Sequence, residues 1–214
     1  MKQNHKAIIE HYEQCFKKYG DTPKGVDWPN EIDLQNRYTV MSELISVRQS
    51  KSYENDSLLD FGCGNAMFLK FLQDHEKFNT LKYTGLDASE EFVKFCKIKH
   101  PNHSFICCDI LEDGNDFLKE YDWIVCNGVF TEKRELAFAD MFQYFKLMIE
   151  LLFSKTKKGL AFNVMSKNVD WERDDLFHLS HDLLSDFLCK NISRNYVIRN
   201  DYGLYEYTTY IYKL

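Results

Sequence analysis

Apolar residues recur along the chain in two patterns, one typical of amphipathic helices and one typical of buried strands. In the first part they repeat every three to four residues, which predicts helices over about 4–18 and 30–46. From residue 57 onward, short apolar runs alternate with amphipathic stretches. The runs predict strands at 57–61, 81–86, 104–108, 123–126 and 159–164. The stretches predict helices at 66–73, between Ser89 and Pro101, around 115–119 and at about 136–153, with Ile32 and Ile98 among the apolar helix positions.

Strands that alternate with helices predict parallel pairing through right-handed crossovers, and therefore an α/β doubly wound domain. The end of the chain has a different character. Residues 195–199 and 204–212 are two further strand patterns, separated by the turn signal Asn200-Asp201-Tyr202-Gly203. This arrangement predicts a hairpin whose last strand is antiparallel. We therefore expect a mostly parallel sheet of seven strands in a single domain over residues 1–214.

Composition and charge narrow the range of partners. The chain has 214 residues with a formal net charge of −6 and no run of Lys or Arg, so a nucleic-acid partner is not expected. No apolar stretch reaches the roughly 20 residues of a membrane span, so no membrane partner is expected. The seven cysteines form no C-x-x-C pair, and the N-terminus lacks an apolar signal region. This combination predicts reduced thiols and a cytoplasmic location.

The chain's main chemical signal is the turn after the strand at 57–61. Gly62 and Gly64 can adopt backbone angles that a Cβ forbids, and they leave room for a ligand against the main chain. The following helix points free N–H groups at the same place. A dinucleotide fingerprint also needs a small residue three positions after the second glycine. Met67 stands there and is bulky, which disfavours a nicotinamide cofactor.

Asp87 ends the second strand, 25 residues after Gly62. A carboxylate at that place can accept hydrogen bonds from both hydroxyls of a ribose. The same geometry serves a nicotinamide cofactor, so Asp87 indicates an adenosine ribose and leaves the rest of the ligand open.

Two stretches resemble motifs of the class I S-adenosylmethionine-dependent methyltransferases. Residues 60–66 resemble motif I, an acidic residue followed by any residue and Gly-x-Gly-x-Gly, with Ala66 in place of the last glycine. Residues 121–130 resemble motif IV. The resemblance covers roughly residues 55–165 and implies S-adenosylmethionine as cofactor. It implies a helical lid over the cofactor mouth (1–50), a cofactor-binding core (55–165), and a substrate-side loop with a C-terminal hairpin (166–214).

The resemblance also implies roles for individual residues. Asp60 would orient the turn or accept a hydrogen bond from the amino group of the methionine moiety. The carbonyls of Asn127 and Gly128 would accept from the same amino group. Asp109 would bind the adenine amino group, and Ile110 would pack on the ring. The full set expected at the cofactor is Arg37, Asp60, Gly62, Cys63, Gly64, Asn65, Asp87, Ala88, Asp109, Ile110, Asn127, Gly128 and Val129.

Arg37 enters this set because a guanidinium can hold a carboxylate through two hydrogen bonds. A surface salt bridge is the alternative for this residue.

The methyl acceptor is less clear from the sequence. Gly128 and Val129 replace the prolines of the motif IV variant used for exocyclic amines, which disfavours methylation of bases. The size and the acidic charge favour a small-molecule acceptor, while a protein acceptor stays possible. The first hypothesis is therefore methyl transfer to an O or N nucleophile of a small molecule. His178, after the fifth predicted strand, and Tyr202, in the hairpin turn, are the candidates for a catalytic role, with His178 as a general base. No metal-ligand spacing is specific. A protein that binds the cofactor without methyl transfer is the second hypothesis, and a nicotinamide oxidoreductase is the third.

Overall fold

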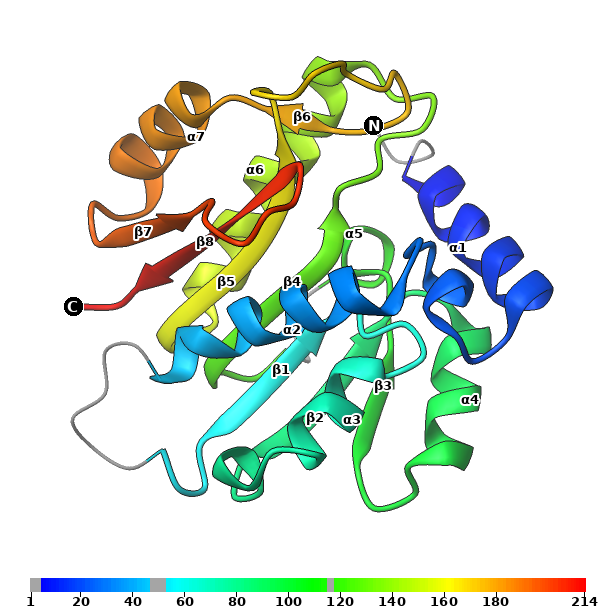
Figure 1. Cartoon of the computed structure of the whole chain (residues 1–214). Coiled ribbons are helices and arrows are strands. Elements are labelled where there is room, and N and C mark those ends of the chain that lie inside the picture. Colours follow the sequence, from blue (N-terminus) through cyan, green and yellow to red (C-terminus); the bar gives the residue numbers. More distant parts are fainter. Residues whose placement is uncertain (1–4, 47–52, 115–117) are drawn as a thin grey trace.

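A central sheet between two helical layers organises the computed structural model, which describes residues 5–46, 53–114 and 118–214 (Figure 1). The sheet follows the order β3-β2-β1-β4-β5-β8-β7, with a short β6 beside the end of β5. The strands are β1 (Ser57–Phe61), β2 (Lys82–Asp87), β3 (Ser104–Cys107), β4 (Tyr121–Phe130), β5 (Thr156–Ser166), β6 (His178–Leu179), β7 (Tyr196–Arg199) and β8 (Glu206–Tyr212).

The strand pairing confirms the predicted doubly wound sheet. Strands β1 to β5 pair in parallel, while β8 is antiparallel to both β5 and β7. The main path has the seven strands expected. The additional β6 has only two residues, too short for a hydrophobic pattern to reveal it. The chain order reverses between β1 and β4, and open α/β sheets bind ligands outside the carboxyl ends of the strands at such a switch point.

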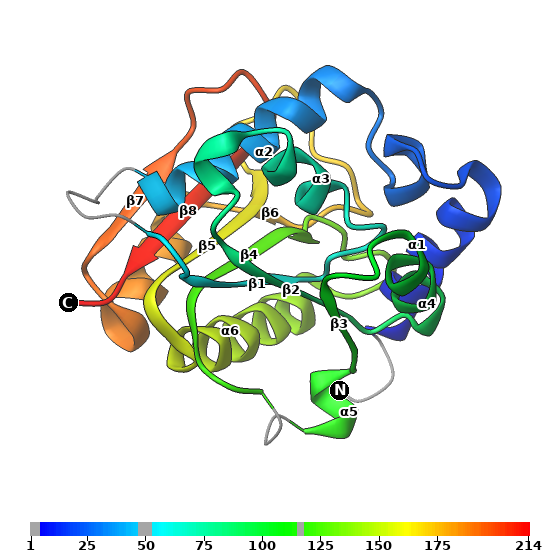
Figure 2. The same cartoon turned by 90° about the horizontal axis from the view of Figure 1, so that it is seen from below.

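Helices cover both faces of the sheet, with α2 and α3 on one face and α5 and α6 on the other (Figure 2). Side chains of β1 alternate between the two layers: Leu58 packs with the cluster under α2 and α3, and Leu59 with the cluster under α6. The helices are α1 (Lys6–Tyr19), α2 (Glu31–Ser46), α3 (Met67–Gln73), α4 (Glu90–Lys99), α5 (Ile110–Asp113), α6 (Phe138–Ser154) and α7 (His181–Phe187). Three shorter turns are η1 (Pro23–Val26), η2 (Glu76–Phe78) and η3 (Leu188–Ile192).

Two residues that the sequence predicted on the apolar faces of helices, Ile32 and Ile98, face solvent instead. Ile32 is 75% exposed and Ile98 is 83% exposed. In α2 the buried positions Leu34, Tyr38 and Met41 recur at intervals of four and three residues. Ile32 precedes Leu34 by two residues, which is about half a helical turn, so it faces solvent.

Two further differences concern short helices. The helix expected around 115–119 lies mostly outside the described residues. The four-residue α5 begins directly after Asp109, and α7 follows β6 in a segment for which the sequence predicted no helix. Both are short, so neither offers two full turns of helical periodicity. Among the described residues, no helix combines the length and the apolar character that crossing a bilayer demands.

Candidate functional site

The glycine turn after β1 has the backbone geometry that the sequence predicted. Gly62 has φ +73°, and a Cβ added there would lie 2.5 Å from the Cγ2 of Val129. Gly64 has φ +51°, in the left-handed region that favours glycine. The N–H groups of Gly62 and Cys63 both donate to the carbonyl of Leu86, at 2.8 and 3.0 Å. The turn is therefore fixed to the end of β2, beside Asp87.

Asp87 stands between the glycine turn and the start of α4. Its Oδ2 accepts from the backbone N–H of Gly64 at 2.8 Å, and its Oδ1 accepts from that of Ser89 at 2.9 Å. Burial raises the pKa of Asp87, and the two backbone hydrogen bonds oppose this shift. The carboxylate is thus held in one orientation at the rim of a cavity, with further lone pairs for a ligand.

Asp60 lies behind the turn. Its side chain is 2% exposed and accepts a 2.7 Å hydrogen bond from the hydroxyl of Tyr83. Burial raises the pKa of Asp60 to about 7, against the lowering effect of the Tyr83 hydrogen bond. Cys63 and Asn65 are also buried, and neither lines the cavity in front of the turn. These three residues of the expected cofactor set support the turn from behind.

The cavity at the switch point has a volume of about 140 Å³. It opens between the glycine turn, the carboxyl ends of β2 and β4, and the N-terminal helix α1. Residues of the expected cofactor set that line it are Gly62, Gly64, Asp87, Ala88, Asp109, Ile110, Asn127, Gly128 and Val129. The sequence therefore placed most of that set around one cavity.

The polar groups of this cavity fit S-adenosylmethionine, which carries an ammonium group, ribose hydroxyls and an adenine amino group as donors. The carboxylates of Asp87 and Asp109 and the carbonyls of β4 are acceptors. The side-chain oxygen of Asn127 is buried and has no hydrogen-bond partner among the described residues. An unpaired buried acceptor is costly, and a bound donor would satisfy it.

Helix α1 closes the cavity with contacts that the sequence did not reveal. The hydroxyl of Tyr12 donates to the carbonyl of Gly128 at 3.2 Å, and Nε2 of His5 lies 2.6 Å from Oδ2 of Asp109. Burial raises the pKa of Tyr12 well above its ordinary value. These partners are distant in sequence, so no local pattern could find them. Asp109 and the carbonyl of Gly128, which were both expected to bind the cofactor, are therefore in contact with His5 and Tyr12. A cofactor that binds there would share these acceptors or displace the two side chains.

A buried polar network supports the end of β4 from the other side. The amide of Gly128 donates to Oδ1 of Asn163 at 2.7 Å, and Nδ2 of Asn163 donates to Glu206 at 3.1 Å. The Nε of Arg37 donates to both carboxylate oxygens of Glu206, each at 2.9 Å. Burial raises the pKa of Glu206, and the Arg37 charge opposes that shift.

Arg37 is therefore paired within the protein. It lines a second cavity and not the first, so it lies away from the other residues expected at the cofactor. The surface salt bridge weighed as the alternative is wrong, because the pair with Glu206 is buried. Its guanidinium carbon lies 3.9 Å from the centroid of the Trp28 ring. Its Nη1 is buried and has no hydrogen-bond partner among the described residues.

A second cavity, of about 640 Å³, adjoins the first and shares Trp28 with it. Aromatic side chains, including Trp28, Trp171 and Tyr205, line its wall together with charged groups. Among these is Glu132, 6% exposed, whose pKa is raised by burial against a hydrogen bond from Arg134. Glu132 was missed, although its place two residues after the motif IV strand could have drawn attention to it.

The two residues expected in catalysis have other contacts. Nδ1 of His178 lies 2.7 Å from the carbonyl of Ser166, and its Nε2 accepts from the backbone N–H of Arg173 at 3.2 Å. Both ring nitrogens have partners in the protein, and His178 also lines the second cavity, so its role as a base stays a prediction. The hydroxyl of Tyr202 lies 3.0 Å from that of Thr208, and Tyr202 lines neither cavity.

Comparisons with known proteins identify the family of the chain. The family profile described as "Methyltransferase domain" matches residues 52–193. The Mycobacterium tuberculosis protein Rv1506c, provisionally named a methyltransferase, is 28% identical over 162 residues, which cover 73% of this chain and 93% of that protein.

Solved structures show the same fold. Magnesium protoporphyrin IX methyltransferase from Synechocystis PCC 6803, with bound S-adenosylmethionine, has a TM-score of 0.63 at 16% identity over 98% of this chain and 97% of that chain. The plantazolicin methyltransferase BpumL, in complex with a triazolic desmethylplantazolicin analogue and S-adenosylhomocysteine, has a TM-score of 0.63 at 15% identity over 99% and 91% of the two chains. Together with the profile match over most of the chain, they show that the chain belongs to the class I S-adenosylmethionine-dependent methyltransferases.

Proposed function

We propose that this methyltransferase acts on an O or N nucleophile of a small molecule that contains a planar ring system. The observation that carries the proposal is the second cavity, which meets the cofactor cavity at Trp28 and has Trp171 and Tyr205 on its wall. The rings of Trp171 and Tyr205 are 6.4 Å apart between centroids, and these side chains are 69% and 58% exposed. Exposed aromatic side chains at a cavity suit a flat, partly apolar ligand. The porphyrin in the name of one structural neighbour and the triazolic analogue bound to another have this character.

The residues proposed to hold the cofactor are those with free acceptor capacity in the first cavity. Asp87 would accept from the ribose hydroxyls, and Asp109 from the adenine amino group once His5 shares or leaves it. Asn127 and the carbonyl of Gly128 would accept from the methionine ammonium. S-adenosylmethionine supplies an already activated methyl group, so the protein's main task is to align the acceptor with it.

Glu132 is proposed as the proton acceptor for the nucleophile. It follows β4, whose end lines the first cavity, and its own side chain lines the second. A hydroxyl or ammonium acceptor has to lose a proton during transfer, and a buried carboxylate can take it. The arginine at position 134 lies 3.3 Å from Oε2 of Glu132 and stabilises the charged form of that carboxylate.

Calorimetric titration tests the cofactor part of the proposal. S-adenosylmethionine and S-adenosylhomocysteine should bind, NAD should not, and Asp87→Ala should abolish binding in a protein that still folds. Failure of both sulfur cofactors to bind the folded protein would refute these site assignments.

Release of S-adenosylhomocysteine during a screen of planar hydroxyl, carboxyl and amine compounds tests the acceptor part. Glu132→Gln should lose turnover and keep cofactor affinity. Tight cofactor binding without turnover on any acceptor would instead favour a protein that binds the cofactor as a regulatory module.

A further inference from the structure

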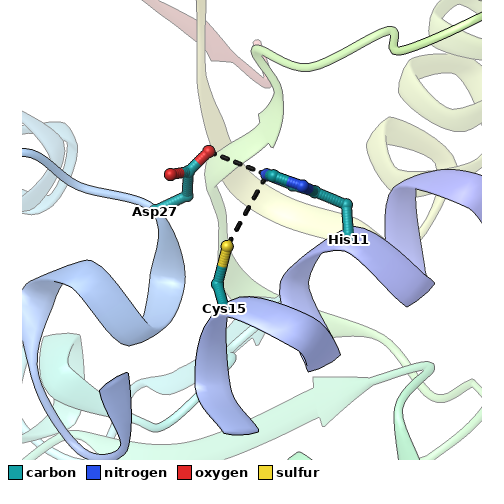
Figure 3. Close-up of side chains that lie close together, drawn as sticks. All are labelled: His11, Cys15 and Asp27. Carbon is teal, nitrogen blue, oxygen red and sulfur yellow. Dashed lines mark hydrogen bonds and ion pairs between the residues drawn. The ribbon is translucent and has the colours of Figure 1, made fainter. Parts of the chain in front are cut away.

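Three potential metal ligands of different chemistry meet between α1 and the segment that follows η1 (Figure 3). His11 and Cys15 are one turn apart on α1, and Asp27 follows η1. The Nε2 of His11 lies 2.8 Å from Oδ2 of Asp27 and 3.8 Å from Sγ of Cys15. One ligand atom from each residue lies within 4.8 Å of the other two. None of the three belongs to the expected cofactor set.

The local backbone holds these side chains together. Helix α1 ends at Gly20, and the chain turns back through η1, whose first turn is capped by the Thr22 side chain accepting from the N–H of Gly25. A Cβ on Gly25 would lie 1.9 Å from the carbonyl oxygen of Gly20, so only glycine permits this close return. Asp27 then adopts φ +58° and faces α1. Positions 11 and 15 share one helix face by their spacing. The cluster is therefore built by the fold and does not depend on a chance meeting of long side chains.

We propose that His11, Cys15 and Asp27 form a Zn²⁺ site. Imidazole, thiolate and carboxylate are the three ligand types that zinc uses. Magnesium and calcium prefer oxygen ligands, so the sulfur and nitrogen donors argue against them. With Zn–N and Zn–O bonds near 2.1 Å and Zn–S near 2.3 Å, a tetrahedral ion separates its ligand atoms by about 3.3–3.8 Å. The observed His11–Cys15 distance already fits, and the His11–Asp27 hydrogen bond has to open by about 0.5 Å.

The cluster leaves room for an ion to enter and for a fourth ligand. The side chains of His11 and Asp27 are 18% and 41% exposed, so the site is open to solvent. Three protein ligands with an open position are the arrangement of zinc sites that bind water or a substrate. Asp27 also lines the second cavity, so the ion would sit beside the proposed acceptor cavity.

A bound ion would join α1 to the η1 loop. The same helix closes the proposed cofactor cavity through Tyr12 and through His5, the residue just before its first turn. Zinc should therefore change the affinity for S-adenosylmethionine, and the cofactor should change the affinity for zinc by the same factor, since coupling of two binding sites is reciprocal. This coupling rests on the proposed cofactor site, whereas zinc binding itself does not.

Equilibrium dialysis of the full chain against buffered Zn²⁺, followed by metal analysis, tests the site without cofactor. We expect one bound zinc per chain, and a more than about tenfold loss of affinity in Cys15→Ser and in Asp27→Asn. Substitution by Co²⁺ should give a thiolate charge-transfer band that disappears in Cys15→Ser. Cys189→Ser is the control for the loss of an accessible thiol, because Cys189 is exposed and lies on η3, away from the cluster.

Thermal unfolding of each variant without metal separates lost binding from lost folding. Zinc that stays bound in Cys15→Ser, or a wild-type protein that takes up no stoichiometric zinc, would overturn the proposal. A zinc site without any effect on cofactor affinity would refute the coupling and leave the metal site standing.

Discussion

Replacement of Asp60 by asparagine should change how the stability of the protein depends on pH. Asp60 is buried behind the glycine turn, and burial raises its pKa to about 7. In the unfolded chain an aspartate titrates near about 3.9. Between these two values the native state binds a proton that the unfolded state does not. The free energy of unfolding therefore falls as pH rises from about 4 to about 7, and it is not regained above that range.

The size of this effect follows from the shift. One pH unit corresponds to about 1.4 kcal/mol, so a gap of about three units makes the ionised side chain cost about 4 kcal/mol above pH 7. About 2–3 kcal/mol of this should be lost between pH 5 and pH 7. The amide introduced by Asp60→Asn would keep an oxygen to accept from Tyr83 and would not ionise. The variant's stability should thus fall less steeply over that range.

Urea unfolding at intervals from pH 5 to pH 8 measures this difference. Subtracting the variant's curve from that of the wild type removes the contribution of other groups that titrate in the same range, apart from those coupled to Asp60. Glu90→Gln is the control, because hydrogen bonding and ion pairing with Lys94 lower the pKa of this exposed carboxylate, away from the range tested. A difference curve that is flat between pH 5 and pH 7 would show that Asp60 titrates alike in both states and would refute the reasoning.

Three other substitutions test separate parts of the structure. Gly62→Ala should weaken cofactor binding and lower the free energy of unfolding by about 1–3 kcal/mol, because the new Cβ would combine a positive φ with a contact of 2.5 Å to a methyl carbon of Val129. Gly203→Ala is its control in the same urea assay, because Gly203 has φ +75° in open space and so isolates the backbone contribution. Arg37→Met should cost about 3–5 kcal/mol by leaving Glu206 buried and unpaired, and a double variant with Glu206→Leu should recover most of that loss in denaturant titrations. His178→Asn should lower stability by about 1–3 kcal/mol through a lost backbone contact. A loss of turnover larger than the loss of folded protein would support the predicted role of His178 as a base, since this residue lines the second cavity.

The sheet could be predicted from the sequence because its signals are local. Each strand of the parallel core is a short apolar run, and the crossover helices α3, α4 and α6 carry their own periodicity. The turn at Gly62 and Gly64 and the carboxylate of Asp87 follow from the same reasoning, since a strand, a turn and a helix fix where their ends lie. Strand β6 has two residues and α5 has four, so neither contains enough periods to be recognised.

The N-terminal helices α1 and α2 could be predicted, but the contacts of α1 could not. His5 meets Asp109 across 104 residues, and Tyr12 meets Gly128 across 116 residues. No spacing rule connects such positions, because the contact depends on how α1 packs over the finished sheet. The cluster of His11, Cys15 and Asp27 could not be predicted from the sequence for a related reason. Two ligands come from a helix and the third from the loop that returns to it, a return that depends on Gly25.

Arg37 shows where reasoning from residue types reaches its limit. The sequence predicted that the guanidinium of Arg37 binds a carboxylate, and in the structure its Nε lies 2.9 Å from each of two carboxylate oxygens. That carboxylate belongs to Glu206, which is 169 residues away in the chain. Chemistry alone cannot distinguish an internal partner from a ligand, since both offer the same two oxygens. Glu206 also accepts from Asn163, which in turn accepts from the amide of Gly128, so Arg37 helps to fix the end of β4 that lines the first cavity.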